Sequence, residues 1–368
     1  MRALVLSGGT GTRLRPFSYS MPKQLMPVAN RPVLAYVLDN IGALGVTEVG
    51  IVVGDGAAPI AQAIGDGSRF GLRVTYLHQD QPLGLAHAVR TARAFLADDD
   101  FVMYLGDNML PEGVLGVAGD FRQNRPAAQL VVHKVTDPQN FGVAELDVDG
   151  NVHRIVEKPR EPRGNLAVVG VYFFTPAVHD AIAAISPGAR GELEITDAVQ
   201  WLITQGFPVR ATEYNGYWKD TGRVEDLLEC NRRVLAMARR DVAGTVDADS
   251  VVDGPVVLGP GARVVRSRID GPAVIGAGTV LEDCHVEPNT AIGADCVLRG
   301  VRLADSIVLD GASLTGVGRL HGSLIGRGAS VGPPEPVGDG ALRHRLLLGD
   351  HSRIEIPLTP VGQEGPGR

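Results

Sequence analysis

The feature that most constrains the fold is a repeat in the last third of the chain. Apolar-plus-glycine steps recur at Leu258-Gly259, Ile275-Gly276, Ile292-Gly293 and Ile325-Gly326, with a weaker step at Leu309-Asp310-Gly311. Their starts are 17, 17, 17 and 16 residues apart, and aliphatic residues return at about every sixth position. This hexapeptide period is typical of a solenoid. It predicts a left-handed parallel β-helix of four to five coils. A β-sandwich is disfavoured because it would need alternating strands and hairpin turns.

The repeat is interrupted by the proline-rich stretch Gly332-Pro333-Pro334-Glu335-Pro336. Beyond it we expect residues 341–357 to fold back as a cap and residues 358–368 to be disordered. A chain of 368 residues is too long for one ordinary core. We therefore expect two domains, 1–240 and 241–357.

The first domain has the alternating periodicity of an α/β protein. Short apolar runs predict buried strands at Arg2–Leu6, Val49–Val53, Leu72–Leu77 and Phe101–Leu105. Helical spacing predicts one helix after Pro32, with Val33, Leu34, Val37, Leu38, Ile41 and Leu44 on one face, and another at Gly84–Leu96. This order predicts a Rossmann-like, mostly parallel sheet covered on both faces. Ligands of such sheets bind beyond the carboxyl ends of the strands.

A glycine-rich loop, Ser7-Gly8-Gly9-Thr10-Gly11-Thr12-Arg13, follows the first predicted strand. Its glycines let the backbone approach a ligand closely, and such a turn can direct N–H groups at a phosphate. Arg13 and Lys23 would add two cations. The loop lacks the Gly-Lys-Ser/Thr ending of a Walker loop, and Leu14 replaces the third glycine of the dinucleotide fingerprint. On its own the loop is equally compatible with an ordinary turn.

Four other segments carry side chains suited to a nucleotide and a sugar phosphate. Asp107, after a strand, and Asp220, before a turn, are carboxylates that could hold a hard cation such as Mg²⁺ together with phosphate oxygens. Lys158 offers a cation between Glu157 and a proline, and Gln79 with the run 82–86 offers an amide and open backbone to a base. Each segment alone also fits a turn, a helix cap or a solvated ion pair, as does 190–197 at the start of a surface helix. Their joint occurrence is what favours a binding site.

Composition narrows the class of protein. The net charge is −7, so a general nucleic-acid binder is not expected. The three cysteines, Cys230, Cys284 and Cys296, form no CxxC pair, which favours a reducing compartment. No apolar run approaches ~18 residues and no signal-peptide pattern opens the chain. We expect a cytoplasmic protein with neither a membrane nor a nucleic-acid partner.

The motif order GGTGTRLRP, PKQLMPV, PLGLAHA, GDN, FGVAE, EKP, GVYFF, RGELEITD and WKDTG resembles the sugar-1-phosphate nucleotidylyltransferases over about residues 1–235. The resemblance is greatest to the members that use dTTP. It implies transfer of dTMP from dTTP to glucose 1-phosphate with release of pyrophosphate and supply of deoxysugar biosynthesis. The β-helical extension is absent from the short form of these enzymes and matches a long form. An exposed solenoid end needs a cap, so we expect the β-helix to form contacts in a homo-oligomer, or else to pack against the catalytic domain.

The resemblance also assigns roles to individual residues. Nucleotide contacts fall on Gly8, Gly9, Gly11, Gln79 and Gly84. Catalytic cations that neutralise phosphate charge fall on Arg13, Lys23 and Lys158. It implies that Asn108, Gly142, Glu157 and Tyr172 contact the hexose. It also implies that Asp107 and Asp220 bind Mg²⁺.

Two departures from the short form leave the choice of nucleotide open. Leu83 occupies the position before Gly84 at which the short form has an Asp. Phe141 occupies the position before Gly142 at which the short form has a Tyr. Transfer of UMP, GMP or AMP is therefore an alternative. A bifunctional enzyme with an acyltransferase β-helix, in which His285 or His321 acts as base, is another. The third is a catalytically inactive regulatory subunit, which the intact set of charged residues disfavours.

Overall fold

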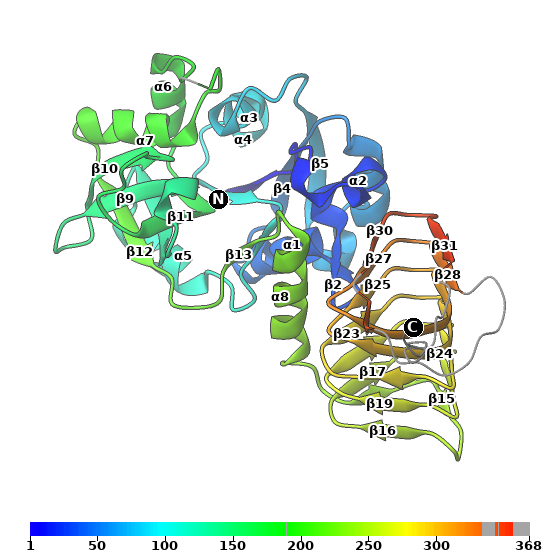
Figure 1. The fold of residues 1–368 in the computed structure, drawn as a ribbon. Helices are drawn as coiled ribbons and strands as arrows, with labels where there is room; N and C mark the ends of the chain where they lie inside the picture. Colours follow the sequence, from blue (N-terminus) through cyan, green and yellow to red (C-terminus); the bar gives the residue numbers. More distant parts are fainter. Residues whose placement is uncertain (189, 333–342, 345, 356–368) are drawn as a thin grey trace, which may run out of the picture. The chain divides into compact units, whose positions relative to one another are not determined.

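The computed structural model describes residues 1–188, 190–332, 343–344 and 346–355 (Figure 1). The chain forms two compact units. The first unit comprises Met1–Thr10, Pro22–Leu25 and Val33–Asp220, and the second comprises Gly11–Met21, Met26–Pro32 and Thr221–Arg368. Within the described residues, no helix has the length and apolar character needed to cross a membrane.

The first unit is built on a nine-stranded sheet. Four strands lie side by side in parallel at its centre, in the order β6 (Phe101–Leu105), β1 (Arg2–Leu6), β4 (Glu48–Val53) and β5 (Arg73–His78). All four predicted strands are confirmed, two of them with the predicted bounds. Strands of this kind are buried on both faces, which explains their continuous apolar runs.

Beyond β6 the sheet becomes antiparallel. β11 (Leu166–Phe174) pairs antiparallel with β6 and with β8 (Ala128–Lys134). β9 (Gly142–Leu146) and β10 (Val152–Glu157) form an antiparallel pair joined by a short turn. β12 (Val209–Glu213) returns parallel to β8. The parallel prediction therefore holds for the first 105 residues, where helices connect the strands.

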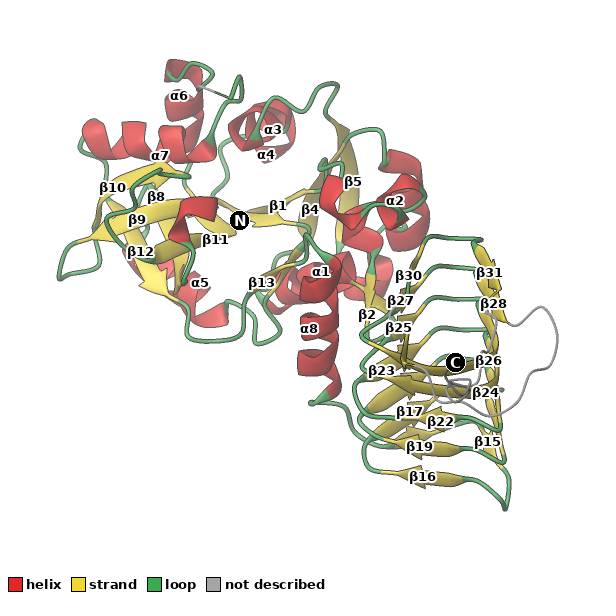
Figure 2. Ribbon diagram, viewed as in Figure 1, coloured by secondary structure: helices red, strands yellow, loops and turns green. Residues whose placement is uncertain are grey.

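Helices cover both faces of this sheet (Figure 2). Leu4 and Leu6 of β1 belong to one buried cluster and Ala3 and Val5 to the other, because successive side chains of a strand point to opposite faces. The first cluster packs against α3 (Leu85–Thr91), α4 (Arg93–Leu96), α6 (Ala177–Ala184) and α7 (Ile195–Thr204). The second packs against α1 (Val33–Ala43), α2 (Ala57–Ile64) and α5 (Leu115–Asn124). The predicted helix 84–96 is thus two helices, which meet at Ala92.

The second unit contains a parallel β-helix, visible as a ladder of short strands in Figure 1. One of its sheets consists of β14 (Asp241–Val242), β17 (Val256–Leu258), β20 (Ala273–Ile275), β23 (Thr290–Ile292), β25 (Ile307–Val308), β27 (Leu324–Ile325) and β30 (Leu347–Leu348). The other consists of β15 (Thr245–Val246), β16 (Val251–Asp253), β18 (Arg263–Val265), β19 (Arg268–Asp270), β21 (Val280–Glu282), β22 (His285–Val286), β24 (Val297–Ala304), β26 (Ser313–His321), β28 (Ser330–Gly332), β29 (Arg343–His344) and β31 (Arg353–Glu355). The predicted solenoid is confirmed.

The strand register corrects one detail of the repeat. Ile292 pairs with Val308, which pairs with Ile325, so the ladder position is Val308 and not Leu309. The coil between Ile292 and Val308 is one residue shorter than the 17-residue coils before it, which shifts the visible Leu309-Asp310-Gly311 step out of register. Strands β29–β31 continue the same ladders in the region predicted as a cap. Residues 358–368, predicted to be disordered, lie outside the described residues.

The second unit includes two N-terminal segments, Gly11–Met21 and Met26–Pro32. The first carries η1 (Thr12–Leu14) and η2 (Phe17–Tyr19), and the second carries β2 (Pro27–Val28) and β3 (Arg31–Pro32). The helix α8 (Val224–Leu235) belongs to the same unit. Ser20 donates from Oγ to Asp350 at 2.8 Å, and Asn30 donates from Nδ2 to the Ile292 carbonyl at 2.6 Å. Asn231 of α8 accepts from the Ala29 N–H at 2.9 Å. Residues far apart in the sequence therefore build this unit, and the predicted domain boundary at 240/241 stays a prediction.

Candidate active site

The site of the first unit begins where β1 and β6 end at the same edge of the sheet. Leu6 pairs with Leu105, so Gly8 and Asp107 follow adjacent strand ends. Gly106 is required between them, because a Cβ there would lie 2.5 Å from the Ser7 hydroxyl. The two motifs that the sequence placed at strand ends are thus brought together by the sheet.

A cavity of about 230 Å³ opens at this edge. It is lined by six of the predicted residues, Gly8, Gly9, Lys23, Gln79, Gly84 and Asp107, together with Leu6, Gln24, Val52, Pro82, Leu85, Ala88, Leu105 and Glu192. We call it the first cavity. A Cβ on Gly9 would lie 2.8 Å from Lys23 Cε, and a Cβ on Gly8 would lie 3.3 Å from Gln79 Oε1. The glycines therefore leave room for side chains that border the cavity.

Charged and polar groups meet at one end of the first cavity. Lys23, on η3 (Lys23–Leu25), forms an ion pair with Asp107, whose residue is only 7% exposed. Asp107 also accepts a hydrogen bond from Asn108 Nδ2 at 3.0 Å, and Trp218 Nε1 donates to Asn108 Oδ1 at 2.7 Å. The Asp107 carboxylate is therefore held by both neighbours.

The second predicted carboxylate lies on the neighbouring strand. In the pair formed by β7 (Asn108–Met109) and β13 (Lys219–Asp220), Asp220 stands opposite Asn108, the residue after Asp107. Among the described residues, no group of three or more His, Cys, Asp or Glu side chains gathers in a metal-binding arrangement. An ion bound here would thus combine two carboxylates with ligand oxygens. That donor set is all oxygen, as a hard cation requires.

The other end of the first cavity is formed by Gln79 and the loop before α3. Gly84 has a φ of +103°, and a Cβ there would lie 2.4 Å from the Leu193 carbonyl oxygen. Leu193 N–H donates to the Leu83 carbonyl at 2.8 Å and Ala86 N–H donates to the Leu193 carbonyl at 3.0 Å. Glycine is required at position 84 on both grounds, conformation and space.

A second cavity, of about 740 Å³, lies beside β10. It is lined by His153, Arg154, Ile155, Val156, Glu157, Lys158, Arg160, Gly188, Arg190, Glu194, Asp197 and Gln200. Lys158 has a φ of +41°, and its N–H donates to the Phe141 carbonyl at 3.0 Å. Its side-chain amine lies 3.6 Å from Glu157. The predicted pair Glu157–Lys158 is therefore part of a cavity wall.

Arg190 organises the acidic groups of this second cavity. Its guanidinium donates to Glu194 at 2.6 Å and to Glu157 at 3.2 Å, and it lies 3.7 Å from Glu192. Burial raises the pKa of Glu194 even though Arg190 opposes the rise. Because Glu192 lines the first cavity and Arg190 the second, this segment borders both.

Three of the predicted hexose contacts, Asn108, Gly142 and Tyr172, line neither cavity. Gly142 pairs with Glu157, and a Cβ on it would lie 2.9 Å from the Thr196 methyl group. Tyr172 is 4% exposed on β11, and burial raises the pKa of its hydroxyl, with a further contribution from Glu157 and Glu194. Gly142 and Tyr172 thus lie close to the Glu157 side chain.

Gly11 and Arg13 fall in the second unit. Gly11 has a φ of +62° and precedes the short helix η1 that carries Arg13. The segment Gly11–Met21 is bounded on both sides by residues of the first unit, Thr10 and Pro22. Chain connectivity thus keeps Arg13 within a few residues of the glycine loop.

Sequence reasoning did not single out Arg190, Gln24, Glu192 or His87. The segment 190–197 was also compatible with the start of a surface helix, but α7 begins only at Ile195. Glu192 and Glu194 lie within four positions of Arg190, and Glu157 comes from a distant segment, so these groups could not be related without the fold. His87 had one signal, its position three residues after Gly84 in a loop already predicted to face a base.

The candidate bases of an acyltransferase site lie on the β-helix. His285 Nε2 is 2.7 Å from Asp270, and the two residues sit on neighbouring coils. His321 ends β26, and its Nδ1 atom is buried without a hydrogen-bond partner in the described structure. Neither ring lines one of the two cavities.

The fold and the two cavities are those of an enzyme that joins a nucleotide to a sugar phosphate. The chain belongs to the nucleotidyl transferase family, whose model matches residues 2–237. It is 52% identical to a glucose-1-phosphate thymidylyltransferase of Streptomyces antibioticus, over 97% of this chain and 99% of that one. It is 53% identical to the protein of that name from Streptomyces griseus, with the same coverage.

A solved structure matches the first part of the chain. It is described as a putative glucose-1-phosphate thymidylyltransferase from Bacillus anthracis in complex with a sucrose, and it is 32% identical with a TM-score of 0.59. The match covers 94% of that chain but 63% of this one. The β-helix is therefore additional to that protein, as the long-form prediction requires.

Proposed function

We propose that this protein transfers dTMP from dTTP to glucose 1-phosphate, giving dTDP-glucose and pyrophosphate. The observation that carries the proposal is the pair of cavities joined by the segment from Arg190 to Glu192. One cavity offers a glycine loop and an amide, which suit a nucleotide. The other offers several cations, among them Lys158 and Arg190, and several carboxylates, which suit a sugar phosphate. The identity with two thymidylyltransferases over nearly the whole chain supports the choice of nucleotide and sugar.

The nucleotide lies, in this proposal, in the first cavity. Gln79 and Gly84 face the base, because one offers an amide and the other an unobstructed backbone. Gly8, Gly9 and Gly11 run along the triphosphate, and Lys23 contacts its phosphates. Lys23 would then exchange part of its contact with Asp107 for the phosphate oxygens.

A divalent cation belongs to this proposal, and Mg²⁺ is the ion that fits best. Asp107 and Asp220 would hold it, since Asp220 stands opposite Asn108, the residue that follows Asp107. When bound, such an ion neutralises developing charge on the phosphates. Two protein carboxylates leave room for water and phosphate oxygens, which Mg²⁺ usually retains.

The sugar phosphate lies in the second cavity. Lys158 binds its phosphate, and Arg190 adds a cation that the sequence did not reveal. Glu157 accepts hydrogen bonds from hexose hydroxyls, with Asn108, Gly142 and Tyr172 contributing to the same subsite. Because Arg190 already bridges Glu157 and Glu194, it also fixes where these carboxylates point.

The reaction needs positioning and charge neutralisation from the protein. A phosphate oxygen of the sugar attacks the α-phosphorus of dTTP in line, the new P–O bond forms, and the bond to pyrophosphate breaks. The attacking phosphate is already ionised at neutral pH, so no general base is needed. Arg13, Lys23 and Lys158 reduce the repulsion between two anions where the transition state carries most charge.

Assembly and location complete the proposal. The first coil exposes Val242, Val246 and Val251, at 39%, 37% and 48%. Solenoid ends need a cover, and a second copy of the chain would supply one. Cys230, Cys284 and Cys296 are buried thiols, which fits a cytoplasmic enzyme. We keep residues 1–240 as its catalytic domain.

The test is pyrophosphate release by the purified full chain with Mg²⁺ and glucose 1-phosphate, offering dTTP, UTP, GTP and ATP in parallel. We expect dTTP to give the highest kcat/KM and Asp107→Ala to abolish the signal. Glu161→Gln, at an exposed carboxylate outside both cavities, is the matched control and should behave as wild type.

The possible outcomes separate the alternatives. Preference for UTP, GTP or ATP would keep the reaction and overturn the base assignment. Silence with all four nucleotides would contradict the proposal and favour a regulatory subunit. Free thiol release from acetyl-CoA would point to a second activity on the β-helix.

A further inference from the structure

Gln79, which the proposal places beside the base in the first cavity, makes a polar contact with His87 to which the proposed reaction assigns no role. Gln79 Nε2 and His87 Nδ1 are 2.8 Å apart, and Nε2 also lies 3.5 Å from the Gly84 carbonyl oxygen. Gln79 is 9% exposed, so its amide has little access to water as an alternative partner. Its orientation is therefore decided by these two neighbours.

Both neighbours are acceptors when the neutral His87 ring carries its proton on Nε2, which leaves Nδ1 unprotonated. A carbonyl oxygen only accepts, and an unprotonated imidazole nitrogen accepts as well. Two acceptors draw the NH₂ group of the amide toward themselves and repel its oxygen. Gln79 Oε1 is then left on the other side, where it lies 3.3 Å from the Cβ position of Gly8, a residue of the cavity wall.

The surroundings of His87 favour the neutral ring. Burial, and then the charge of Arg90, lower the pKa of His87 below its ordinary value of 6.5, while Asp80 opposes this. Arg90 is on the same helix and Asp80 lies on the loop after β5. Of the described charged residues, none on α4, α6, α7 or β1, the elements that pack most extensively on α3, contributes to this shift.

We propose that His87 is a positioning residue that holds the Gln79 amide with its carbonyl oxygen toward the first cavity, so that the site accepts a pyrimidine carrying an N3–H donor. Thymine and uracil carry this donor, whereas cytosine presents an N3 acceptor that would face another acceptor. The inference rests on the proposed placement of the base and deepens it. It names the selected group, the base N3–H, and the residue that enforces the selection without touching the base.

Protonation of His87 reverses the selection. An imidazolium donates from both nitrogens. Its Nδ1–H would oppose the Gln79 NH₂ group and stabilise the rotated amide, with Nε2 toward the cavity. The rotated amide is a donor, which matches cytosine N3 and clashes with the N3–H of thymine. Preference for dTTP over dCTP should therefore fall as the pH falls through the His87 pKa.

The experiment measures kcat/KM for dTTP and for dCTP with glucose 1-phosphate in the same buffers, from about pH 8 down to pH 5. The ratio of the two values is the readout, because titration of the triphosphates, the sugar phosphate and the catalytic groups cancels in it. Cytosine N3 itself begins to take up a proton at the low end of this range, so the effect of His87 is the difference between the wild-type profile and that of a variant without the titrating ring. Wild type should lose about tenfold of its dTTP preference across this range. The loss should lie in KM for the nucleotide, with the KM for glucose 1-phosphate unchanged.

Three variants sharpen the test. His87→Leu removes the acceptor and should lower the dTTP/dCTP ratio about tenfold at neutral pH. His87→Asn keeps an amide oxygen near the Nδ1 position without a titrating ring, so it should retain the ratio and lose its pH dependence. His179→Leu is the matched control, because burial lowers the pKa of His179 as well but its ring stacks on Phe101 and lines neither cavity.

The results separate this inference from the reaction itself. A wild-type protein that does not turn over dTTP contradicts the proposed function. A protein that turns over dTTP with a ratio that is flat with pH and unchanged in His87→Leu overturns the positioning role alone. If His87→Leu is unfolded by circular dichroism, the wild-type pH profile and His87→Asn still decide the question.

Discussion

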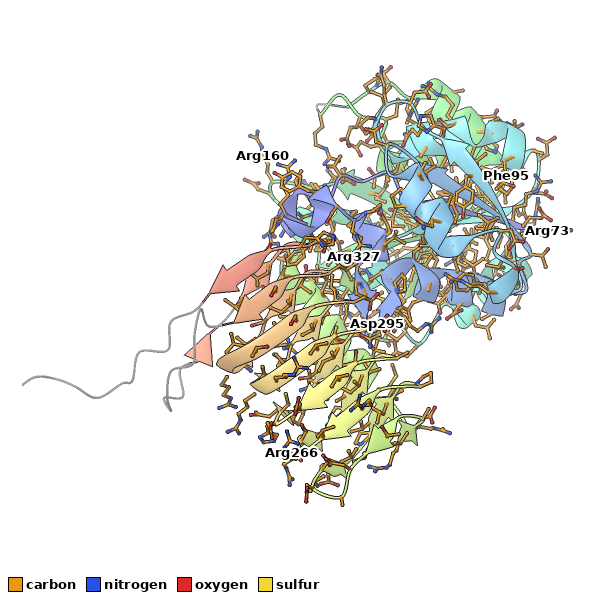
Figure 3. All side chains as sticks on the ribbon, turned by 90° about the vertical axis from the view of Figure 1, so that its right-hand side faces the viewer. Arg73, Phe95, Arg160, Arg266, Asp295 and Arg327 are labelled. Atoms are coloured by element: carbon orange, nitrogen blue, oxygen red, sulfur yellow. The ribbon has the colours of Figure 1, made fainter. Side chains whose placement is uncertain are left out.

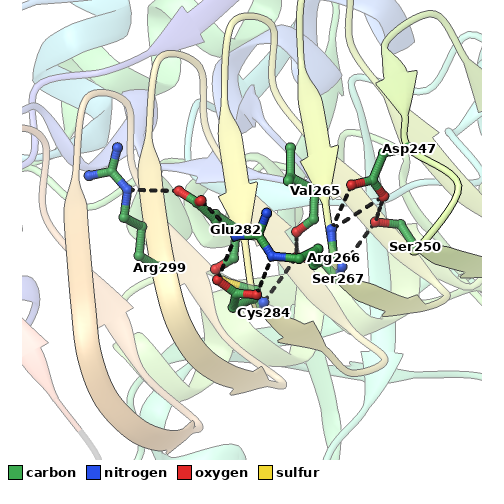
Figure 4. A network of polar contacts seen from close by, with 9 residues as sticks. Asp247, Ser250, Val265, Arg266, Ser267, Glu282, Cys284 and Arg299 are labelled. Carbon is green, nitrogen blue, oxygen red and sulfur yellow. Dashed lines mark hydrogen bonds and ion pairs between the residues drawn. The ribbon is translucent and has the colours of Figure 1, made fainter.

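The two units of this molecule use charged side chains in opposite ways. In the first unit, charges converge on cavities: Lys23 and Asp107 at one, Lys158 and Arg190 at the other. In the β-helix, charges pair along the outside of the coils. Arg266 binds Glu282 at 2.7 Å and Asp283 at 2.8 Å, and Arg299 binds Glu282 at 3.1 Å (Figure 4).

The difference follows from the repeat. Every coil of a β-helix places the same position above the last, so a charge on one coil meets its counter-ion on the next. Arg266 projects from the outside of the early coils in this way, and Arg327 of the later coils reaches Asp350 at 3.0 Å (Figure 3). Non-repeating connections at the edge of an α/β sheet have no such partner built in. Both cavities at which charges converge are therefore lined by segments outside the repeat.

The largest effect is expected at Arg13, which lies in the second unit but is assigned to the reaction. Arg13→Ala should lower kcat by about 10²–10³, with a much smaller change in KM for glucose 1-phosphate. The reason is that its charge acts mainly on the departing pyrophosphate. Steady-state kinetics with dTTP and glucose 1-phosphate measure both constants. Arg266→Ala, on the exposed ladder, is the matched control. Equal kcat values for wild type and Arg13→Ala would contradict a role of Arg13 in the reaction.

An intermediate effect is expected from trimming one methyl group in each unit. Ile275→Val in the β-helix and Ile51→Val in β4 both change side chains that are at most 1% exposed. Each should lower the free energy of unfolding by about 0.5–1.5 kcal/mol. Chemical denaturation followed by far-UV circular dichroism measures this. In a solenoid each coil contacts only its neighbours, so Ile275→Val should also increase hydrogen exchange mainly in the adjacent coils. Uniform exchange over the whole chain would show that the β-helix is not locally cooperative.

The smallest effect is expected from the paired carboxylates of the β-helix at low pH. Burial raises the pKa of Glu287, but hydrogen bonds from Arg302 and Arg319 outweigh it and leave the pKa below its ordinary 4.5. A lowered pKa stabilises the folded state above pH 4.5, and this contribution is lost as the pH falls through the folded-state value. Glu287→Gln should therefore be less stable than wild type at neutral pH by no more than about 1 kcal/mol. The two proteins should converge once the pH has fallen below the folded-state pKa of Glu287.

Thermal unfolding midpoints at a series of pH values check this convergence. Glu161→Gln again serves as the control, since its carboxylate is exposed. A difference between wild type and Glu287→Gln that stays constant down to low pH would mean that packing, and not charge, explains it.

Much of the architecture could be predicted because each half has its own period. The run Arg2–Leu6 is apolar at every position after the first, so it could only be a strand buried on both faces. The 17-residue spacing predicted the ladder. It failed at Leu309, where the coil is one residue short, and after Ile325, whose partner on the next coil is Leu348. The antiparallel strands β8–β11 were not predicted as such, because apolar runs do not reveal the direction of their neighbours.

Site residues that are glycines or that follow the end of a strand could be predicted from the sequence. Site residues whose interaction partners come from distant segments could not. Gly8, Gly9 and Asp107 follow adjacent strands, so their meeting follows from the sheet. Arg190 and His87 gave no comparable signal, because their partners are chosen by packing. The assignment of Gly11–Met21 to the second unit could not be read from the sequence either, since its partner residues lie at the far end of the chain.

The hydrogen bond between Ser20 and Asp350 has a consequence for how the protein is made. It spans 330 residues, so the ribosome delivers Ser20 long before Asp350. Contacts of such long range form late in folding. A chain truncated before Asp350 would contain every motif residue and still lack this hydrogen bond to the segment that carries Arg13.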